Sequence, residues 1–112
     1  MTSVEGVLQS ALRGLSLRQR TIADNIANIE TPGFLAGRVD FESSLRAAAA
    51  GGDLADAQPV VARSLEPTRT NGNNVNLDQE TVKAMETGLR YELTVTALTN
   101  KFNGLRMVIG NR

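Results

Sequence analysis

The side chains that could support acid–base chemistry in this sequence are carboxylates, loosely gathered in its first half as Asp24, Glu30, Asp40 and Glu42. Neither histidine nor cysteine occurs among the 112 residues. Their absence removes the commonest general base near neutral pH, the thiol nucleophile, disulfides and the usual ligands of zinc. Isolated surface carboxylates usually form a solvated face. We therefore expect no catalytic residues and no metal site.

The sequence also contains no motif for binding phosphate groups, nucleic acid or a membrane surface. The Gly51-Gly52 and Asn71-Gly72 pairs precede no Lys-Ser/Thr pair, so neither matches a phosphate-binding loop, and we expect no cofactor and no small-molecule substrate. Lys plus Arg and Asp plus Glu both total 12, which gives no basic excess for binding nucleic acid. Acids and bases are mixed along the polar faces, unlike those of a membrane-surface helix. With these classes excluded, the sequence predicts a structural or interaction protein.

Two carboxamides have a spacing that suits recognition of the backbone. Asn25 and Asn28 are three residues apart, on adjacent turns of one helix face, just before Thr31-Pro32-Gly33. A carboxamide both donates and accepts hydrogen bonds, so the pair could cap backbone groups of a neighbouring segment. The same residues could equally make local bonds at the end of a helix, and spacing alone leaves both interpretations open.

An amphipathic helix over residues 3–31 is predicted to carry this pair. Its apolar residues recur every three or four positions, which is the helical period. Proline disfavours helix in the residue before it and glycine permits a left-handed turn, so Pro32 and Gly33 should end the helix. The stripe consists of Leu8, Leu12, Leu15, Ile22, Ile26 and Ile29.

A second helix is predicted over residues 77–110, because Asn76 and Gln79 resemble a capping box. Its heptad stripe consists of Tyr91, Val95, Leu98, Phe102, Leu105 and Ile109. A second apolar strip, Val82, Met85, Leu89 and Leu93, runs beside it in the N-terminal half.

The middle segment, residues 32–76, should be irregular. A short helix is expected over 40–50, with Phe41 and Leu45 on its apolar side. Residues 58–66 should be extended and able to form a β-ribbon, although Pro59 and Pro67 argue against a central strand. We therefore predict a single, mainly all-α domain over residues 1–112, built on an antiparallel helical pair or coiled coil.

Each terminal helix would be ~40–50 Å long, and a two-helix hairpin covers only one side of each apolar stripe. Hydrophobic residues make up 41% of the chain but aromatic residues only 4%, so the middle segment has few large side chains to cover the rest. A heptad stripe that no segment of its own chain covers is usually covered by a helix of another chain. A hairpin that closes its own core is the alternative, and the pattern alone leaves both open.

Three blocks resemble one protein family. Ile22 to Phe34 contains Asn-x-x-Asn-x-x-Thr-Pro-Gly-aromatic, which resembles the signature of the bacterial flagellar axial proteins of rod and hook. Asn71 to Glu80, and Leu89-Arg90-Tyr91 with Leu98 to Arg106, resemble the proximal-rod type of that family. Residues 47–69 contribute almost nothing, and Leu35-Ala36-Gly37 stands where a basic residue often follows the aromatic.

The resemblance implies a structural subunit of the basal-body rod that packs through its terminal helices and transmits torque across the periplasm. It implies export by the flagellar type III system without a cleaved signal, and the N-terminal residues show no such signal. The implied partners are other copies of the chain, other proximal-rod proteins, the junction protein FliE, the membrane ring and the export gate.

The residues expected at subunit contacts belong to the two stripes and the turn between them. Two alternatives remain: another rod component such as FlgC, and a small secreted helical-hairpin interaction protein, which would need a tryptophan that this chain lacks. The expected contact residues are Leu8, Leu12, Leu15, Ile22, Asn25, Ile26, Asn28, Thr31, Pro32, Gly33, Phe34, Tyr91, Val95, Leu98, Phe102, Leu105 and Ile109.

Overall fold

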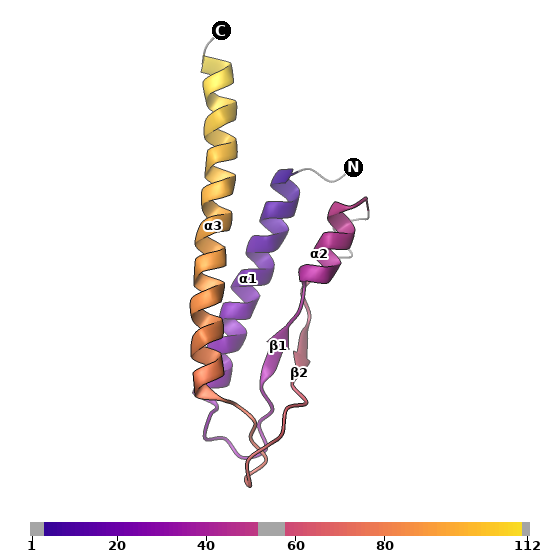
Figure 1. The fold of residues 1–112 in the computed structure, drawn as a ribbon, viewed down its shortest axis with the longest axis vertical. Helices are drawn as coiled ribbons and strands as arrows, with labels where there is room; N and C mark the ends of the chain where they lie inside the picture. Colours follow the sequence, from indigo (N-terminus) through magenta and orange to yellow (C-terminus); the bar gives the residue numbers. More distant parts are fainter. Residues whose placement is uncertain (1–3, 52–57, 111–112) are drawn as a thin grey trace.

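The computed structural model describes residues 4–51 and 58–110. The elements follow the order α1 (Val4–Ala27), β1 (Gly37–Val39), α2 (Glu42–Ala49), β2 (Val61–Arg63) and α3 (Leu77–Gly110). The two long helices lie side by side and antiparallel, and the β1–β2 ribbon and α2 lie beside α1 (Figure 1). The predicted fold class, mainly α with a small ribbon in the middle, is confirmed.

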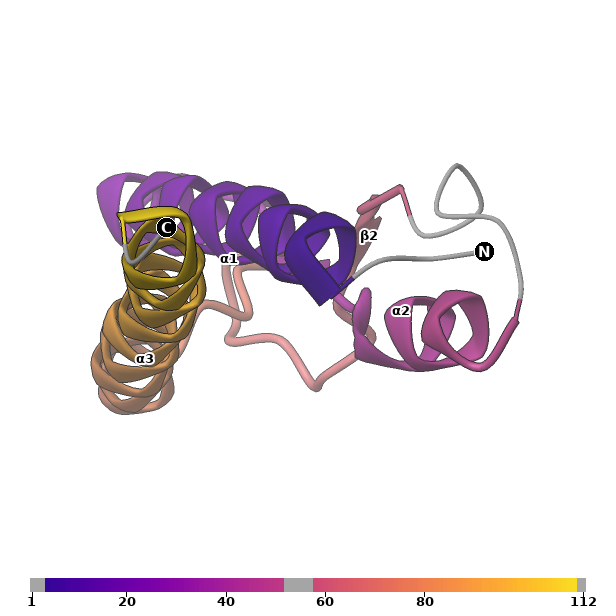
Figure 2. The ribbon, with the colours of Figure 1, turned by 90° about the horizontal axis from the view of Figure 1, so that it is seen from above.

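The central element is α1, which packs against α3, β1 and α2. Seen along the long axis, α3 and α2 lie apart on different sides of α1 (Figure 2). The molecule is elongated, with extents of 67 × 26 × 14 Å. None of the helices in the described ranges is long and apolar enough to span a membrane.

The first helix ends at Ala27, four residues before the expected end at 31. The Asn28 amide is shared between the Asp24 and Asn25 carbonyls, and the Ile29 amide bonds the Ile26 carbonyl three residues back. This tightening is typical of a last helical turn. The helix therefore ends before Pro32 can act on it, and its expected start at Ser3 lies outside the described residues.

The second long helix has the expected bounds. The Asn76 Oδ1 atom accepts a hydrogen bond from the Gln79 amide at 3.2 Å, which caps α3 so that it begins at Leu77. At 34 residues, α3 is ten residues longer than the 24-residue α1. The difference corresponds to ~15 Å of helix. Its C-terminal end consequently projects past α1 (Figure 1).

The middle segment forms the elements that were expected, in shorter form. Helix α2 lies within the expected range 40–50, and β2 lies within the expected extended range 58–66. Strand β2 pairs antiparallel with β1, with Gly37 opposite Arg63 and Val39 opposite Val61. Gly51, with φ +128°, follows α2 at the expected break, while Gly52 lies outside the described residues.

A small apolar core joins α1 to the middle segment. Leu15, Val39 and Phe41 are buried together, and Ala11 and Leu45 pack against them. The Phe41 ring lies against α1 at Gly14, where a Cβ atom would come within 2.6 Å of the ring carbons. Glycine at this position is therefore what allows α1 to approach the ring.

Replacing Gly14 with alanine should lower the free energy of unfolding by about 1–3 kcal/mol, because the added methyl group overlaps the Phe41 ring. Urea unfolding followed by circular dichroism measures the loss. In a Phe41→Leu background the same change should be neutral or stabilising, since alanine favours a helix over glycine by about 0.5–1 kcal/mol. An equal loss in both backgrounds would contradict the contact.

Candidate assembly interface

Asn25 holds α1 to two other elements. It is 1% exposed, and its Oδ1 atom accepts a hydrogen bond from the Gly37 amide at 2.8 Å. Its Nδ2 atom donates to the Gly37 carbonyl at 3.0 Å and to Glu80 Oε2 at 3.1 Å. One side chain therefore ties α1 to the start of β1 and to the first turn of α3.

Asn73 performs the same task for the turn after α1. Its side chain is fully buried, and Nδ2 donates to the Asn28 carbonyl at 2.8 Å and to the Thr31 carbonyl at 2.9 Å. Its Oδ1 atom accepts from the Val75 amide at 2.8 Å. The Thr-Pro-Gly turn is thus held from a segment more than 40 residues away.

Asn74 holds the ribbon in the same manner. Its Oδ1 atom accepts from the Ala36 amide at 2.7 Å, and its Nδ2 atom donates to the Ser64 carbonyl at 3.2 Å and the Glu66 carbonyl at 3.1 Å. The composition of residues 70–74, Thr-Asn-Gly-Asn-Asn, predicts a turn and does not distinguish Asn73 and Asn74 as residues that hold other segments. The sequence signal that could have identified them is the pair of adjacent carboxamides just before Val75 and the Asn76 helix cap.

The two loops at this end of the molecule also contact each other directly. The Gly33 amide donates to the Asn71 carbonyl at 2.8 Å, and a Cβ atom on Gly72 would lie 3.2 Å from the Gly33 Cα. Both glycines have positive φ, +73° and +83°. The Arg69 guanidinium donates to the Ile29 carbonyl, and to the Val75 carbonyl at 2.8 Å. The end from which both long helices emerge is therefore densely hydrogen-bonded.

Glu42 links the three helices. Its carboxylate accepts from Arg18 at 2.6 and 2.8 Å and from Arg90 at 3.2 Å. The hydrogen bond from Arg18 is the largest cause that lowers the pKa of Glu42 below its ordinary value of 4.5. The carboxylate is therefore ionised and occupied by arginines, as a structural ion pair requires.

Because the folded-state pKa of Glu42 is lowered, its stabilising contribution is complete above about pH 4.5 and disappears as the pH falls through the lower, folded value. Glu42→Gln should cost on the order of 1 kcal/mol at pH 7, since the carboxylate is partly solvent-screened. Thermal unfolding of both proteins from pH 7 to pH 3 should show their difference vanishing at the acid end. The exposed Glu66→Gln is the control, and a difference independent of pH would refute the ion pair.

The carboxylates form no catalytic arrangement in the described part of the chain. Glu42 and Glu80 line one polar hollow of ≈ 220 Å³ between α1, β1 and α3, but each accepts hydrogen bonds from other side chains. No group of three acidic, histidine or cysteine residues in the described ranges could hold a metal ion. The hollow is therefore a polar contact between secondary-structure elements, with its carboxylates engaged in structural hydrogen bonds.

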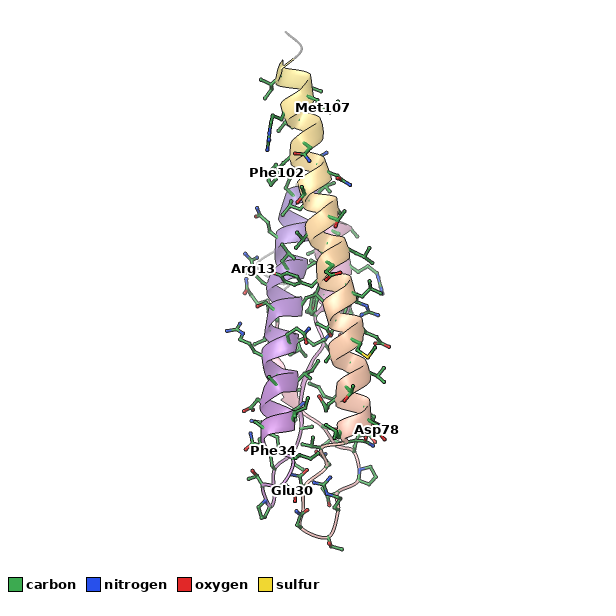
Figure 3. The ribbon with its side chains drawn as sticks, turned by 90° about the vertical axis from the view of Figure 1, so that its left-hand side faces the viewer. Arg13, Glu30, Phe34, Asp78, Phe102 and Met107 are labelled. Carbon is green, nitrogen blue, oxygen red and sulfur yellow. The ribbon has the colours of Figure 1, made fainter. Side chains whose placement is uncertain are left out.

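The longest helix leaves much of its apolar surface uncovered. Thr87 is buried against α1 and Leu98 is half-buried, but Phe102, Leu105 and Ile109 are 45%, 57% and 59% exposed. Phe102 lies at the level of the N-terminal end of α1, and Met107 lies beyond it (Figure 3). On the other side of α3, Val82, Met85, Leu89 and Leu93 are each more than half exposed.

The residues expected at subunit contacts divide into three groups in the isolated chain. Leu15, Ile22 and Asn25 are buried within it, so they have partners in their own subunit, and we no longer place them at contacts with other chains. Half-buried residues are Leu8, Leu12, Ile26, Asn28, Phe34 and Leu98. Exposed residues are Thr31, Pro32, Gly33, Tyr91, Val95, Phe102, Leu105 and Ile109.

An elongated helical chain whose longest helix keeps an uncovered apolar surface belongs to the class of assembly subunits, which complete their packing with other chains. Residues 7–34 match the family model described as flagella basal body rod protein. These residues include α1 from Val7 onward and the turn that Asn73 holds.

Relatives over nearly the whole chain identify the member of that class. The chain is 30% identical to the flagellar basal body rod protein FlgB of Borreliella burgdorferi, over 85% of this chain and 87% of the relative. It is 30% identical to FlgB of Yersinia enterocolitica (90% and 89% covered) and 29% identical to FlgB of Bacillus subtilis (91% and 89% covered). The chain belongs to the FlgB family of flagellar basal body rod proteins.

The predicted family is thereby confirmed. The chain is a structural subunit of the flagellar rod and not an enzyme. Matches to FlgB proteins over most of the chain disfavour the two alternatives, another rod component such as FlgC and a secreted helical hairpin.

Proposed function

We propose that this chain forms part of the proximal rod, where its terminal helices pack against neighbouring subunits and transmit torque across the periplasm. The observation that carries this proposal is the uncovered C-terminal third of α3, whose apolar residues have no partner surface in α1. Burial of each large apolar side chain contributes about 1.5–3 kcal/mol, which offsets the entropy lost when subunits are ordered in an assembly.

Torque transfer requires that force applied to one helix reach the other. The asparagine and arginine contacts at the loop end supply this connection, because Asn25 bridges α1, β1 and α3 and Asn73 joins the turn after α1 to the start of α3. In this mechanism force passes through packed surfaces and no covalent bond changes. Contacts between unlike surfaces of successive copies produce an open helical series, as a rod needs.

The proposed neighbours are other copies of the chain, other proximal-rod proteins, the junction protein FliE, the membrane ring and the export gate. The proposed route is export by the flagellar type III system without a cleaved signal. A sequence without cysteine is compatible with threading through a narrow channel, since no disulfide can cross-link the chain. The proposed contact residues are the exposed and half-buried members of the expected set.

Deletion of the gene and recovery of the tagged chain test this function. Cells without the gene should lack rod, hook and filament, and a plasmid copy should restore swimming. The tagged chain should purify with the basal bodies, beside the proximal-rod proteins in cross-linking mass spectrometry. Intact rods in the deletion strain, or a tagged chain absent from purified basal bodies, would refute the proposal.

A further inference from the structure

The charges of α3 are segregated along its length. Residues 94–110 carry Lys101 and Arg106 and no acidic side chain, whereas the acidic residues of α3 all lie in residues 77–93. The two bases of that first half are engaged within the subunit, Lys83 with Glu80 at 3.8 Å and Arg90 with Glu42 at 3.2 Å. The remaining charges of the first half are the exposed carboxylates Asp78, Glu86 and Glu92.

These carboxylates border an apolar surface that we term the outer strip, formed by Val82, Met85, Leu89 and Leu93. At about 100° per residue, the strip lies on the side of α3 opposite the buried Glu80 and Thr87. The same rotation places Glu86 on one edge of the strip and Glu92 on the other. The outer strip is thus an exposed apolar surface with acidic edges.

The projecting end of α3 has the opposite charge. Phe102, Leu105 and Ile109 continue the side of α3 that α1 covers over its earlier turns. Phe102 lies at the level of the N-terminal end of α1 (Figure 3), and Leu105 and Ile109 follow it along the projecting part of α3. Lys101 and Arg106 lie on the two edges of this exposed seam, as flanking residues do in a coiled coil. We term residues 99–110 the overhang.

We propose that the overhang of one copy packs in parallel orientation on the outer strip of α3 in a second copy, with Lys101 and Arg106 beside Glu86 and Glu92. The two surfaces match in length, since Phe102 to Ile109 and Met85 to Leu93 each cover about two turns of helix. They belong to one straight helix, so an overhang reaches the outer strip of another copy only. The seam it would extend is the existing α1–α3 contact.

This pairing rests on the proposed rod function and specifies which surfaces of two subunits would be in contact in the rod. Overhang and outer strip are unlike surfaces, so each parallel contact leaves one of each free and the series stays open. Matching Phe102–Ile109 to Met85–Leu93 offsets successive copies by about 16 residues of helix, or ~24 Å.

Introduced cysteines test the contact, because the chain has none of its own. A tagged, purified Leu105→Cys protein is mixed with an untagged Leu89→Cys protein and oxidised. Both positions are more than half exposed, so the substitutions should leave the fold intact. A mixed disulfide is expected at high yield, whereas Leu105→Cys mixed with Ala62→Cys, on the exposed face of β2, should give little. Equal yields from the two mixtures would overturn the contact.

Charge reversal tests whether the paired charges stabilise the contact between the overhang and the outer strip. Lys101→Glu with Arg106→Glu in the Leu105→Cys protein should lower the yield about tenfold at low salt, because two attractions become repulsions. Adding Glu86→Lys with Glu92→Lys to the Leu89→Cys protein should restore the yield to within about twofold. A yield that reversal leaves unchanged, or that the second reversal fails to restore, would overturn the pairing.

Sedimentation of the uncross-linked wild-type protein tests whether the series of contacts stays open. The parallel contact gives a series of species beyond two copies, and a mass that stops at two copies would overturn it. A tagged chain found in basal bodies without a mixed disulfide would refute this inference and leave the rod function standing. A chain absent from basal bodies would refute the rod function by itself.

Discussion

An Asn73→Asp subunit is expected to be severely destabilised at 25 °C and pH 7. The substitution keeps the shape of the side chain but replaces Nδ2, which donates to the Asn28 and Thr31 carbonyls, with a charged oxygen. Two carbonyls lose their donor, and a carboxylate is buried against them. Each unsatisfied buried group costs about 1–3 kcal/mol and a charge costs more, so the total loss should be about 4 kcal/mol or more. Urea unfolding followed by circular dichroism measures it.

Asn76→Asp is the matched control for this change. It is the same substitution three residues along the chain, at an exposed position where Oδ1 caps α3. Aspartate caps a helix about as well as asparagine, so the free energy of unfolding should change by less than about 0.5 kcal/mol. If both variants lost the same stability, the buried bonds of Asn73 would not be what holds the turn.

Cells that carry Phe102→Asp in place of the wild-type gene should be non-motile and should form no rod. A carboxylate would stand in the middle of the apolar seam that the rod contact is proposed to bury, which costs several kcal/mol at every contact. The subunit itself should fold normally, because Phe102 is 45% exposed and lies at the level of the N-terminal end of α1, where α1 covers α3 no further. Soft-agar swimming, electron microscopy of basal bodies and thermal unfolding of the purified protein provide the measurements.

Asn103→Asp is the matched control for assembly, since it introduces the same charge on the next residue, away from the seam. It should swim at close to the wild-type rate. Export of Phe102→Asp, measured as protein outside the cytoplasm, should also persist, which separates failed assembly from failed secretion. Normal swimming with Phe102→Asp would remove this residue from the subunit contact.

Local signals in the sequence were sufficient to predict the helices. The period of three to four in α1 and α3 and the Asn76 cap are properties of neighbouring residues, so helix type and the start of α3 follow from them. Strand β1 is only Gly37–Val39, too short to show alternation, and its existence depends on its pairing with β2. The end of α1 likewise depended on its last-turn hydrogen bonds, which no pattern displays.

Which apolar residues are covered could not be predicted from pattern. Leu15 and Leu105 occupy equivalent positions in similar stripes, but Leu15 faces Phe41 while Leu105 lies past the end of α1. Periodicity identifies an apolar face without identifying its partner. The hydrogen bonds of Asn73 and Asn74 could not be predicted for the same reason. Asn73 donates to carbonyls 42 and 45 residues away, and local sequence does not indicate such distant partners.

The most direct test of the central claim, that other chains cover the C-terminal third of α3, is amide hydrogen exchange of residues 99–110 in the free subunit and in purified rods. Exposed helix without tertiary packing should exchange rapidly in the dilute subunit. Packing in the rod should slow these amides by about a hundredfold or more, as several kcal/mol of burial requires. Residues 99–110 that exchange at the same rate in the free subunit and in the rod would contradict the account.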